Sequence, residues 1–198
     1  MFTGIITQAG LFRGYLKGRA ELALEAPGLA GRVAPGDSVA VDGVCLTVIR
    51  RDARLVFFNL SRETLDRSTL GTLRAGDKLN LELPLTLAAP IGGHLVSGHV
   101  DFTAKLLRTT SRKPGRRLEF SLDREFRFYF ISKGSAAVNG VSLTVAALRP
   151  SSFEVEVIPV TLEKSNLGTL KPGDTANVEC DMIGKYVYNL INLRKNED

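Results

Sequence analysis

The sequence predicts an all-β fold made of two tandem six-stranded Greek-key β-barrels followed by one C-terminal α-helix. The first observation is an internal repeat, because residues 36–48 and residues 133–145 are identical at eight of thirteen positions without a gap. The second is that apolar residues alternate with polar ones or run in short β-branched bursts, which is typical of strands. The third is that each copy contains only one short segment with a helical pattern. Closure into a barrel hides the edges that such short strands expose.

The repeat extends over most of the chain at a nearly constant offset. Residues 64–82 match residues 161–179 at eleven of nineteen positions, and residues 2–6 match residues 96–100 with a slightly shorter offset. We expect this last segment to be the first strand of each copy. The expected organisation is a first barrel over residues 1–87, a linker over 88–96, a second barrel over 97–181, and an oligomerisation helix with its tail over 182–198.

Strand, turn and helix signals follow one another in the same order in both copies. In the first copy the strand-like runs are residues 38–41, 44–48, 55–58 and 78–82. Asp42-Gly43 and Asn139-Gly140 lie between such runs and suit the positive-φ positions of a tight hairpin. Short helices are expected over residues 62–70 and 162–167, each closed by a glycine placed as a C-cap.

A final amphipathic segment follows the second copy. Asp181 can cap a helix here, because its carboxylate can accept a hydrogen bond from the first turn. The apolar residues on one face of this helix are Ile183, Tyr186, Val187, Leu190, Ile191 and Leu193. An isolated helix of this length is marginal without tertiary contacts. The apolar face therefore either packs back on its own barrel or forms an oligomer.

Composition and charge exclude several classes of protein. The formal net charge is +5, but the densest basic run, residues 112–117, contains Pro and Gly and is typical of a solvated turn. Aromatic residues are not interleaved with Arg and Lys, so we expect no nucleic-acid partner. Cys45 and Cys180 form no disulfide framework, and no secretion signal or membrane span is evident, which favours a cytoplasmic protein without a membrane partner. His94 and His99 have no metal-ligand spacing, so we expect no metal site.

A duplicated module implies two similar ligand sites, so residues common to both copies are candidates for binding. The shared polar residues are hydroxyls, namely Thr3 or Ser97, Thr47 or Thr144, and Thr64 or Thr161. Hydroxyls and exposed main-chain groups suit a flat heterocycle with amide-like edges, which needs both donors and acceptors. Each of these threonines, taken alone, is also a common strand residue.

Positions that differ between the copies are candidates for chemistry. Cys45 stands where the second copy has Ser142, His99 stands where the first copy has an isoleucine, and Asp181 where it has a proline. A thiol, an imidazole and a carboxylate can act as nucleophile, base and orienter if they converge in space. The alternative for the cysteine is a buried core position, because free cysteine is among the most buried residue types.

The ordered motifs of the chain resemble those of one known family. The motifs are MFTGII, GDSVAVDGVCLTV, NLSRETLDRSTLG, IGGHLVSGHVD, KGSAAVNGVSLTV, VIPVTLEKSNLG and VECDMIGKYV. Together they cover nearly the whole chain and resemble the riboflavin synthase family of the lumazine-binding, alpha-chain type. The resemblance implies a homotrimer with each active site between the first barrel of one subunit and the second barrel of a neighbour. It also implies association with lumazine synthase.

The activity that the resemblance implies joins two identical molecules. Two molecules of 6,7-dimethyl-8-ribityllumazine would give riboflavin and 5-amino-6-(D-ribitylamino)uracil without a cofactor. The C7 methyl group of this lumazine is acidic, so the enzyme mainly has to orient two substrates and move protons. The implied catalytic residues are Phe2, Ser38, Cys45, His99, Ser142 and Asp181. Cys45 and Ser38 would assist at C7 of the acceptor lumazine, and His99 and Asp181 would transfer protons.

The resemblance also implies three substrate-binding segments in each copy. In the first copy they are Gly4, Ile5, Ile6, Cys45, Leu46, Thr47, Asn59, Leu60, Ser61, Arg62, Glu63 and Thr64. In the second copy they are Gly98, His99, Val100, Ser142, Leu143, Thr144, Ile158, Pro159, Val160, Thr161, Leu162 and Glu163. Lys133 matches a position that reaches the ligand from the adjacent subunit, and Val160 departs from relatives that often carry a polar residue. The alternative function is that of a lumazine protein, which binds the ligand without converting it.

Overall fold

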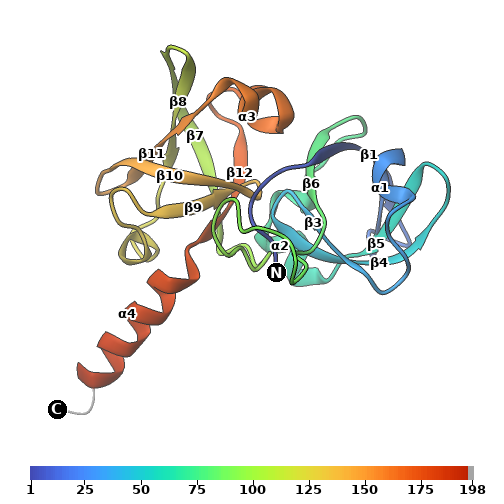
Figure 1. Cartoon of the computed structure of the whole chain (residues 1–198), viewed down its shortest axis with the longest axis horizontal. Coiled ribbons are helices and arrows are strands. Elements are labelled where there is room, and N and C mark those ends of the chain that lie inside the picture. The colour runs from blue at the N-terminus through green and yellow to red at the C-terminus, as the bar shows by residue number, and fades with distance from the viewer. Residues whose placement is uncertain (196–198) are drawn as a thin grey trace.

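The computed structural model describes residues 1–195 and contains two closed β-barrels side by side (Figure 1). The strands of the first barrel are β1 (Gln8–Leu16), β2 (Glu21–Glu25), β3 (Ser38–Val41), β4 (Val44–Arg51), β5 (Leu55–Asn59) and β6 (Lys78–Glu82). Those of the second are β7 (Phe102–Arg112), β8 (Gly115–Ser121), β9 (Ser135–Val138), β10 (Val141–Leu148), β11 (Ser152–Val157) and β12 (Thr175–Cys180). Around the wall, both barrels follow the same strand order, β1-β2-β5-β4-β3-β6 and β7-β8-β11-β10-β9-β12. The predicted fold of two tandem six-stranded barrels is confirmed.

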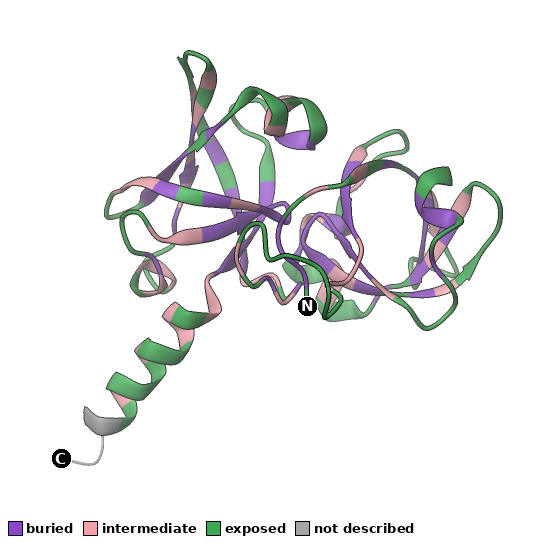
Figure 2. Ribbon diagram, viewed as in Figure 1, coloured by how far each residue is buried: buried purple, intermediate pink, exposed green. Residues whose placement is uncertain are grey.

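Side-chain alternation along the strands separates each core from the outer surface. In β4, Leu46 lies in the core between Cys45 and Thr47, which point outward, and β10 repeats this alternation around Leu143. Each barrel has its own apolar core, and the buried residues appear as purple bands along the strands in Figure 2. Cys45 is half-buried on the outside of its barrel, so the core alternative for this residue is wrong.

Helical segments connect the strands of each barrel. The helices are α1 (Pro27–Ala30), α2 (Arg62–Arg67), α3 (Pro159–Lys164) and α4 (Met182–Lys195), and the 3-10 turns are η1 (Thr69–Gly71), η2 (Arg127–Tyr129) and η3 (Asn166–Gly168). The predicted C-cap role of Gly71 and Gly168 is wrong, because each α-helix ends earlier, before an extended serine. A Cβ atom on Gly71 would lie 2.1 Å from the carbonyl oxygen of Leu65. Glycine is therefore required here by close packing of the chain on itself.

The two predicted hairpins meet tip to tip where the barrels touch. Asp42 and Gly43 have φ values of 46° and 79°, and Asn139 and Gly140 have values of 45° and 75°, as the tight turn requires. A Cβ atom on Gly43 would lie 2.7 Å from the backbone nitrogen of Gly140, and the reverse distance is 2.8 Å. Neither Gly43 nor Gly140 can be replaced by a residue with a side chain without separating the barrels.

The segment 2–6 is not the first strand of the first barrel, so this prediction is wrong. β1 begins at Gln8, and Phe2 instead forms an isolated antiparallel bridge with Val96. These two side chains join Ala40 and Ala137 in a small buried cluster between the barrels. The equivalent segments of the two copies pair with each other, which takes both of them out of the barrel walls.

The C-terminal helix α4 projects away from both barrels (Figure 1). The backbone N–H of Ile183 donates to Oδ1 of Asp181 over 3.0 Å, so the predicted cap forms. The Tyr188 ring, halfway along the helix, packs against those of Phe128 and Tyr129. The apolar face is between 50% and 69% exposed, which contradicts packing on its own barrel. None of the helices within residues 1–195 has the length and apolar character that a membrane crossing requires.

Candidate functional site

The segments 2–6 and 96–100 are exchanged between the two barrels. The backbone N–H of Ser142 donates to the carbonyl of Gly4 over 2.8 Å, and that of Cys45 donates to the carbonyl of Gly98 over 2.8 Å. Ile6 packs against the core of the second barrel. Sequence reasoning groups the first segment with the first barrel and the second segment with the second barrel. In the structure each segment keeps hydrogen bonds to its own barrel and also lies against the other barrel, so each candidate half-site contains residues from both copies.

Two buried carboxylates anchor the exchanged segments. Oε1 of Glu82 accepts hydrogen bonds from the backbone N–H and the hydroxyl of Thr3, at 2.6 and 2.7 Å, and Glu179 binds Ser97 in the same way. Burial raises the pKa of Glu82, even though these hydrogen bonds favour the charged form. The shared hydroxyls of Thr3 and Ser97, predicted from the repeat as ligand contacts, therefore donate to carboxylates of the fold.

A pocket of about 280 Å³ forms where the first exchanged segment meets the second barrel. Its lining residues are Gly4, Ile5, Ile6, Val141, Ser142, Val160, Thr161, Lys164 and Ser165. Six of these belong to the predicted substrate-binding set, namely Gly4, Ile5, Ile6, Ser142, Val160 and Thr161. Ile5 and Val160 remain 45% and 46% exposed, so the pocket has an open apolar rim. Apolar walls with a few hydroxyls suit a flat, polar-edged heterocycle.

Ser142 and Cys45 occupy equivalent positions but have different surroundings. Nδ1 of His94 lies 2.7 Å from Oγ of Ser142. Within the part of the chain that the structure describes, no side chain hydrogen-bonds the Cys45 thiol. The repeat predicts the difference between serine and cysteine, whereas His94 enters the sequence analysis only as a rejected metal ligand.

The nucleophile, base and orienter proposed from the sequence form no hydrogen-bonded set in the part of one subunit that the structure describes. Asp181 caps α4 with its carboxylate, and His99 is exposed in a cavity of about 530 Å³ at the base of that helix. Among residues 1–195, no hydrogen bond joins the side chains of Cys45, His99 and Asp181. Residues 1–195 contain no group of three or more His, Cys, Asp or Glu side chains that could hold a metal ion.

Several other predicted site residues point away from any ligand surface. Phe2, Leu46, Leu60 and Leu143 are at most 8% exposed, so their side chains belong to the packed interior. Their main chains alone remain available for contacts. Lys133 lies in an exposed turn before β9, outside the pocket of the second barrel.

Many of the remaining predicted residues lie in the equivalent helices α2 and α3 or directly before them. Ser61 caps α2 by accepting a hydrogen bond from the backbone N–H of Thr64 over 3.0 Å. Arg62 and Glu63 form exposed ion pairs within the same helix. On the outer face of the first barrel, Ser38 is paired with Thr47 across β3 and β4. Asn59 ends β5 just before α2, and Ile158 directly precedes α3, which contains Pro159, Leu162 and Glu163. Gly98 and Val100 lie in the segment 96–100, and Thr144 lies on β10.

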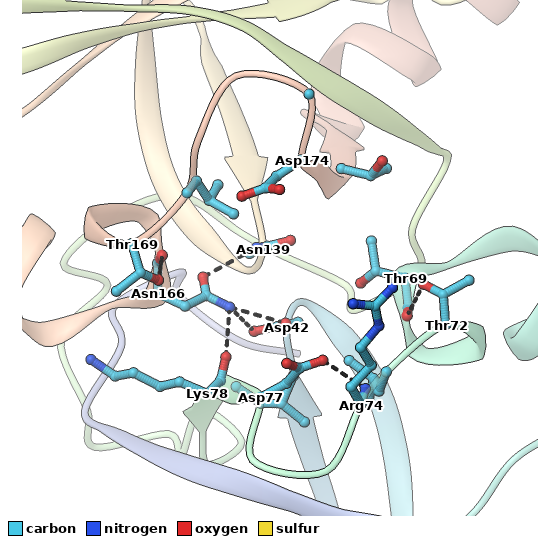
Figure 3. A pocket seen from close by; sticks show the side chains of 15 residues that line it. Asp42, Thr69, Thr72, Arg74, Asp77, Lys78, Asn139, Asn166, Thr169 and Asp174 are labelled. Carbon is cyan, nitrogen blue, oxygen red and sulfur yellow. Dashed lines mark hydrogen bonds between the residues drawn. The ribbon is translucent and has the colours of Figure 1, made fainter.

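A second cavity, of about 540 Å³, lies at the junction of the barrels (Figure 3). The buried carboxylate of Asp42 faces it, together with Asn166 from the second barrel and the charged side chains of Arg74 and Asp77. Burial raises the pKa of Asp42 to about 7, despite hydrogen bonds to its carboxylate. The repeat contains a signal for this site, an aspartate opposite an asparagine, but from the sequence both residues are explained by the tight turns alone.

Comparison with known proteins identifies the class. The model of the lumazine binding domain matches residues 3–84 and residues 97–181. The chain is 37% identical to the riboflavin synthase of Mycobacterium tuberculosis (strain ATCC 25618 / H37Rv), covering 96% of this chain and 98% of that protein. It is also 37% identical to riboflavin synthase of Bacillus amyloliquefaciens, covering 96% and 90%.

Solved structures support the fold. The crystal structure of LumP complexed with riboflavin has a TM-score of 0.84 at 23% identity, covering 91% of this chain and 99% of that chain. The fold and the paired half-sites thus define a protein with two tandem lumazine-binding domains. More narrowly, the chain belongs to the riboflavin synthase family.

Proposed function

We propose that this protein is a riboflavin synthase, a transferase that acts in the last step of riboflavin biosynthesis. It converts two molecules of 6,7-dimethyl-8-ribityllumazine into riboflavin and 5-amino-6-(D-ribitylamino)uracil. The observation that carries the proposal is the pair of equivalent half-sites beside Ser142 and Cys45. A reaction between two identical molecules needs two similar binding places, and the duplicated fold supplies them.

The chemistry requires orientation and proton transfer more than a cofactor. One lumazine gives up a four-carbon unit, which the other gains to complete the third ring of riboflavin. The C7 methyl group of one molecule must lose a proton, and a nucleophile must add at C7 of the other. Holding the two molecules in reactive geometry can contribute about 7–11 kcal/mol in favourable cases.

The residue roles that we propose are those that the resemblance to the family implies. Cys45 and Ser38 are proposed to assist at C7 of the acceptor, because both belong to the β3–β4 face of the first barrel. His99 and Asp181 are proposed to move protons. Since these groups form no hydrogen-bonded set within one subunit, the proposal requires a neighbouring subunit to complete each site.

A homotrimer is the assembly that we propose. The apolar face of α4 and the rim residues Ile5, Ile158 and Val160, which are 45% to 57% exposed, are the surfaces that such contacts would bury. Each active site would lie between the first barrel of one subunit and the second barrel of its neighbour. Association with lumazine synthase, which makes the substrate, is part of the same proposal.

Incubation of the purified protein with 6,7-dimethyl-8-ribityllumazine tests the proposal. We expect one riboflavin for every two lumazines consumed, followed by absorbance and chromatography. The alternative is a lumazine protein, which would bind the lumazine and leave it unchanged. Binding without riboflavin formation at any enzyme concentration would contradict the proposed activity.

A further inference from the structure

Within the described chain, the hydroxyl of Ser142 has one side-chain hydrogen-bond partner, the imidazole of His94. Nδ1 of the imidazole lies 2.7 Å from the serine Oγ. Ser142 lines the pocket of about 280 Å³, whereas His94 lies behind the serine and does not line the pocket. The imidazole can therefore act on a molecule in this pocket only through the serine hydroxyl.

Close approach of two main chains brings His94 to this position. Its backbone N–H donates to the carbonyl of Thr3 over 3.2 Å. A Cβ atom on Gly93 would lie 2.3 Å from the carbonyl oxygen of Thr3 and 2.6 Å from Cβ of Ser142. Only glycine fits at residue 93, and this fit sets the imidazole against the serine. The segment between the barrels thus supports Ser142 from behind the pocket and also connects the barrels.

The surroundings of the ring favour one neutral tautomer. Burial lowers the pKa of His94, and the facing charges of Asp181 and Glu179 offset this effect only in part. Nε2 is buried and has no hydrogen-bond partner among the described residues. A buried acceptor without a partner is tolerated better than a buried N–H without one. The proton therefore belongs on Nδ1, which donates to the Oγ of Ser142.

We infer that His94 is a positioning residue that turns the hydroxyl proton of Ser142 into the pocket. There it donates to a carbonyl oxygen or ring nitrogen of the bound lumazine. This inference rests on the proposed function for the identity of the ligand. The equivalent thiol of Cys45 is a weak donor and lacks such a partner. The two half-sites therefore offer different hydrogen bonds to two identical molecules. The half-site of the second barrel holds the carbonyl oxygen or ring nitrogen of its lumazine more firmly.

Two variants at residue 94 separate this role from packing. In His94→Asn the side-chain amide can stand where Nδ1 stood and donate to the serine, whereas His94→Phe keeps the ring shape and loses the donor. We expect His94→Phe to weaken lumazine binding and to lower kcat/KM by about three- to tenfold, the effect of one lost hydrogen bond. In His94→Asn, the lumazine affinity and kcat/KM should both stay within about twofold of the wild-type values.

A double-mutant cycle with Ser142→Ala completes the test. If His94 acts through the serine, His94→Phe should have no further effect on lumazine binding in the Ser142→Ala background. Equal losses in both backgrounds, or equal losses for the Asn and Phe variants, would overturn the inference. Dissociation constants are measured from the fluorescence of lumazine and riboflavin, so they do not require turnover. A wild-type protein that binds lumazine without converting it would refute the proposed function, and these constants would still decide the role of His94.

Discussion

The side-chain amide of Asn166 donates to both carboxylate oxygens of Asp42, over 3.0 Å to Oδ1 and 3.1 Å to Oδ2. This contact joins the second barrel to the first at the centre of a buried polar junction. Around it, Asn80 donates to the carbonyl of Asn139 over 2.9 Å, and Asn177 donates to the carbonyl of Asp42 over 2.8 Å. The carboxylate thus has hydrogen-bond donors, but it has no ion-pair partner among residues 1–195. Burying a charge in this way is costly.

The first prediction is that ionisation of Asp42 weakens the folded state. Burial raises the pKa of this group from 3.8 to about 7, and Asp77 adds repulsion. Between these values the folded protein binds more protons than the unfolded chain. The free energy of unfolding should therefore fall as the pH rises through this window, by up to about 4 kcal/mol.

Denaturant unfolding of the wild type and of Asp42→Asn between pH 4 and pH 9 measures this effect. The variant keeps an oxygen for the backbone N–H of Asn80 and cannot ionise. The stability difference, wild type minus variant, should decrease with rising pH and level off above about pH 8. A difference that is constant or that grows over this range would contradict the prediction.

The second prediction concerns the hairpin tips. Gly43→Ala should destabilise the protein by more than about 2 kcal/mol, because the new Cβ would meet the backbone of Gly140 at 2.7 Å. Gly18→Ala is the matched control, because Gly18 also has a positive φ but has open space around its Cβ position. The control should lose only about 1 kcal/mol. Thermal and denaturant unfolding measure both variants. Equal losses of stability in Gly43→Ala and Gly18→Ala would show that the tips separate without cost.

The third prediction concerns the chemistry at Cys45. Cys45→Ser should lower the rate of riboflavin formation by about tenfold or more and leave lumazine binding largely unchanged, because a hydroxyl is a weaker nucleophile than a thiol. Steady-state rates and ligand titrations measure the two effects separately. A wild-type rate in the variant would reduce Cys45 to a packing residue.

Cys180 provides an internal control for chemical labelling of Cys45. Burial in the second barrel raises the pKa of its thiol, and the side chain is 1% exposed. Iodoacetamide should therefore modify Cys45 first, and riboflavin should slow this reaction if the half-site is occupied. Preferential labelling of Cys180, measured by peptide mass spectrometry, would contradict the burial pattern.

The fourth prediction concerns α4. Leu190→Lys places a charge on the exposed apolar face, so we expect the proposed trimer to dissociate while the barrels stay folded. Asn189→Lys adds the same charge beside this face and should leave the assembly intact. Sedimentation and circular dichroism measure assembly and folding separately. An unchanged trimer in Leu190→Lys would remove the reason for assigning this face to the subunit interface.

Local patterns in the sequence predict the fold well. The strand at residues 44–48 and the hairpin at Asp42-Gly43 depend on residues close together in the chain, and the structure confirms both. The helix ends are predicted less well, because the need for Gly71 comes from the carbonyl of Leu65 rather than from a positive φ. That contact leaves no distinctive pattern in the sequence.

The arrangement of the site is harder to predict for a physical reason. Because the two copies are so similar, the segment around Gly4 is chemically compatible with either barrel, and nothing local shows that it lies against Ser142. His94 falls outside the most strongly repeated blocks, so a comparison of the copies does not single it out. Contacts between the two copies of a repeat depend on packing between residues that are far apart in the sequence.

The exchange of segments also bears on the origin of the chain. A single ancestral module had no second copy to receive its N-terminal segment, so two separate chains would have had to swap these segments. A fragment ending near Ser97 should therefore form a symmetric dimer, in which Gly4 of each molecule takes the place of Gly98 against Cys45 of the other. Duplication and fusion of the gene for such a swapped dimer would give one polypeptide with the contacts seen here. Its two halves would then be free to differ, with a cysteine on one side and a serine on the other.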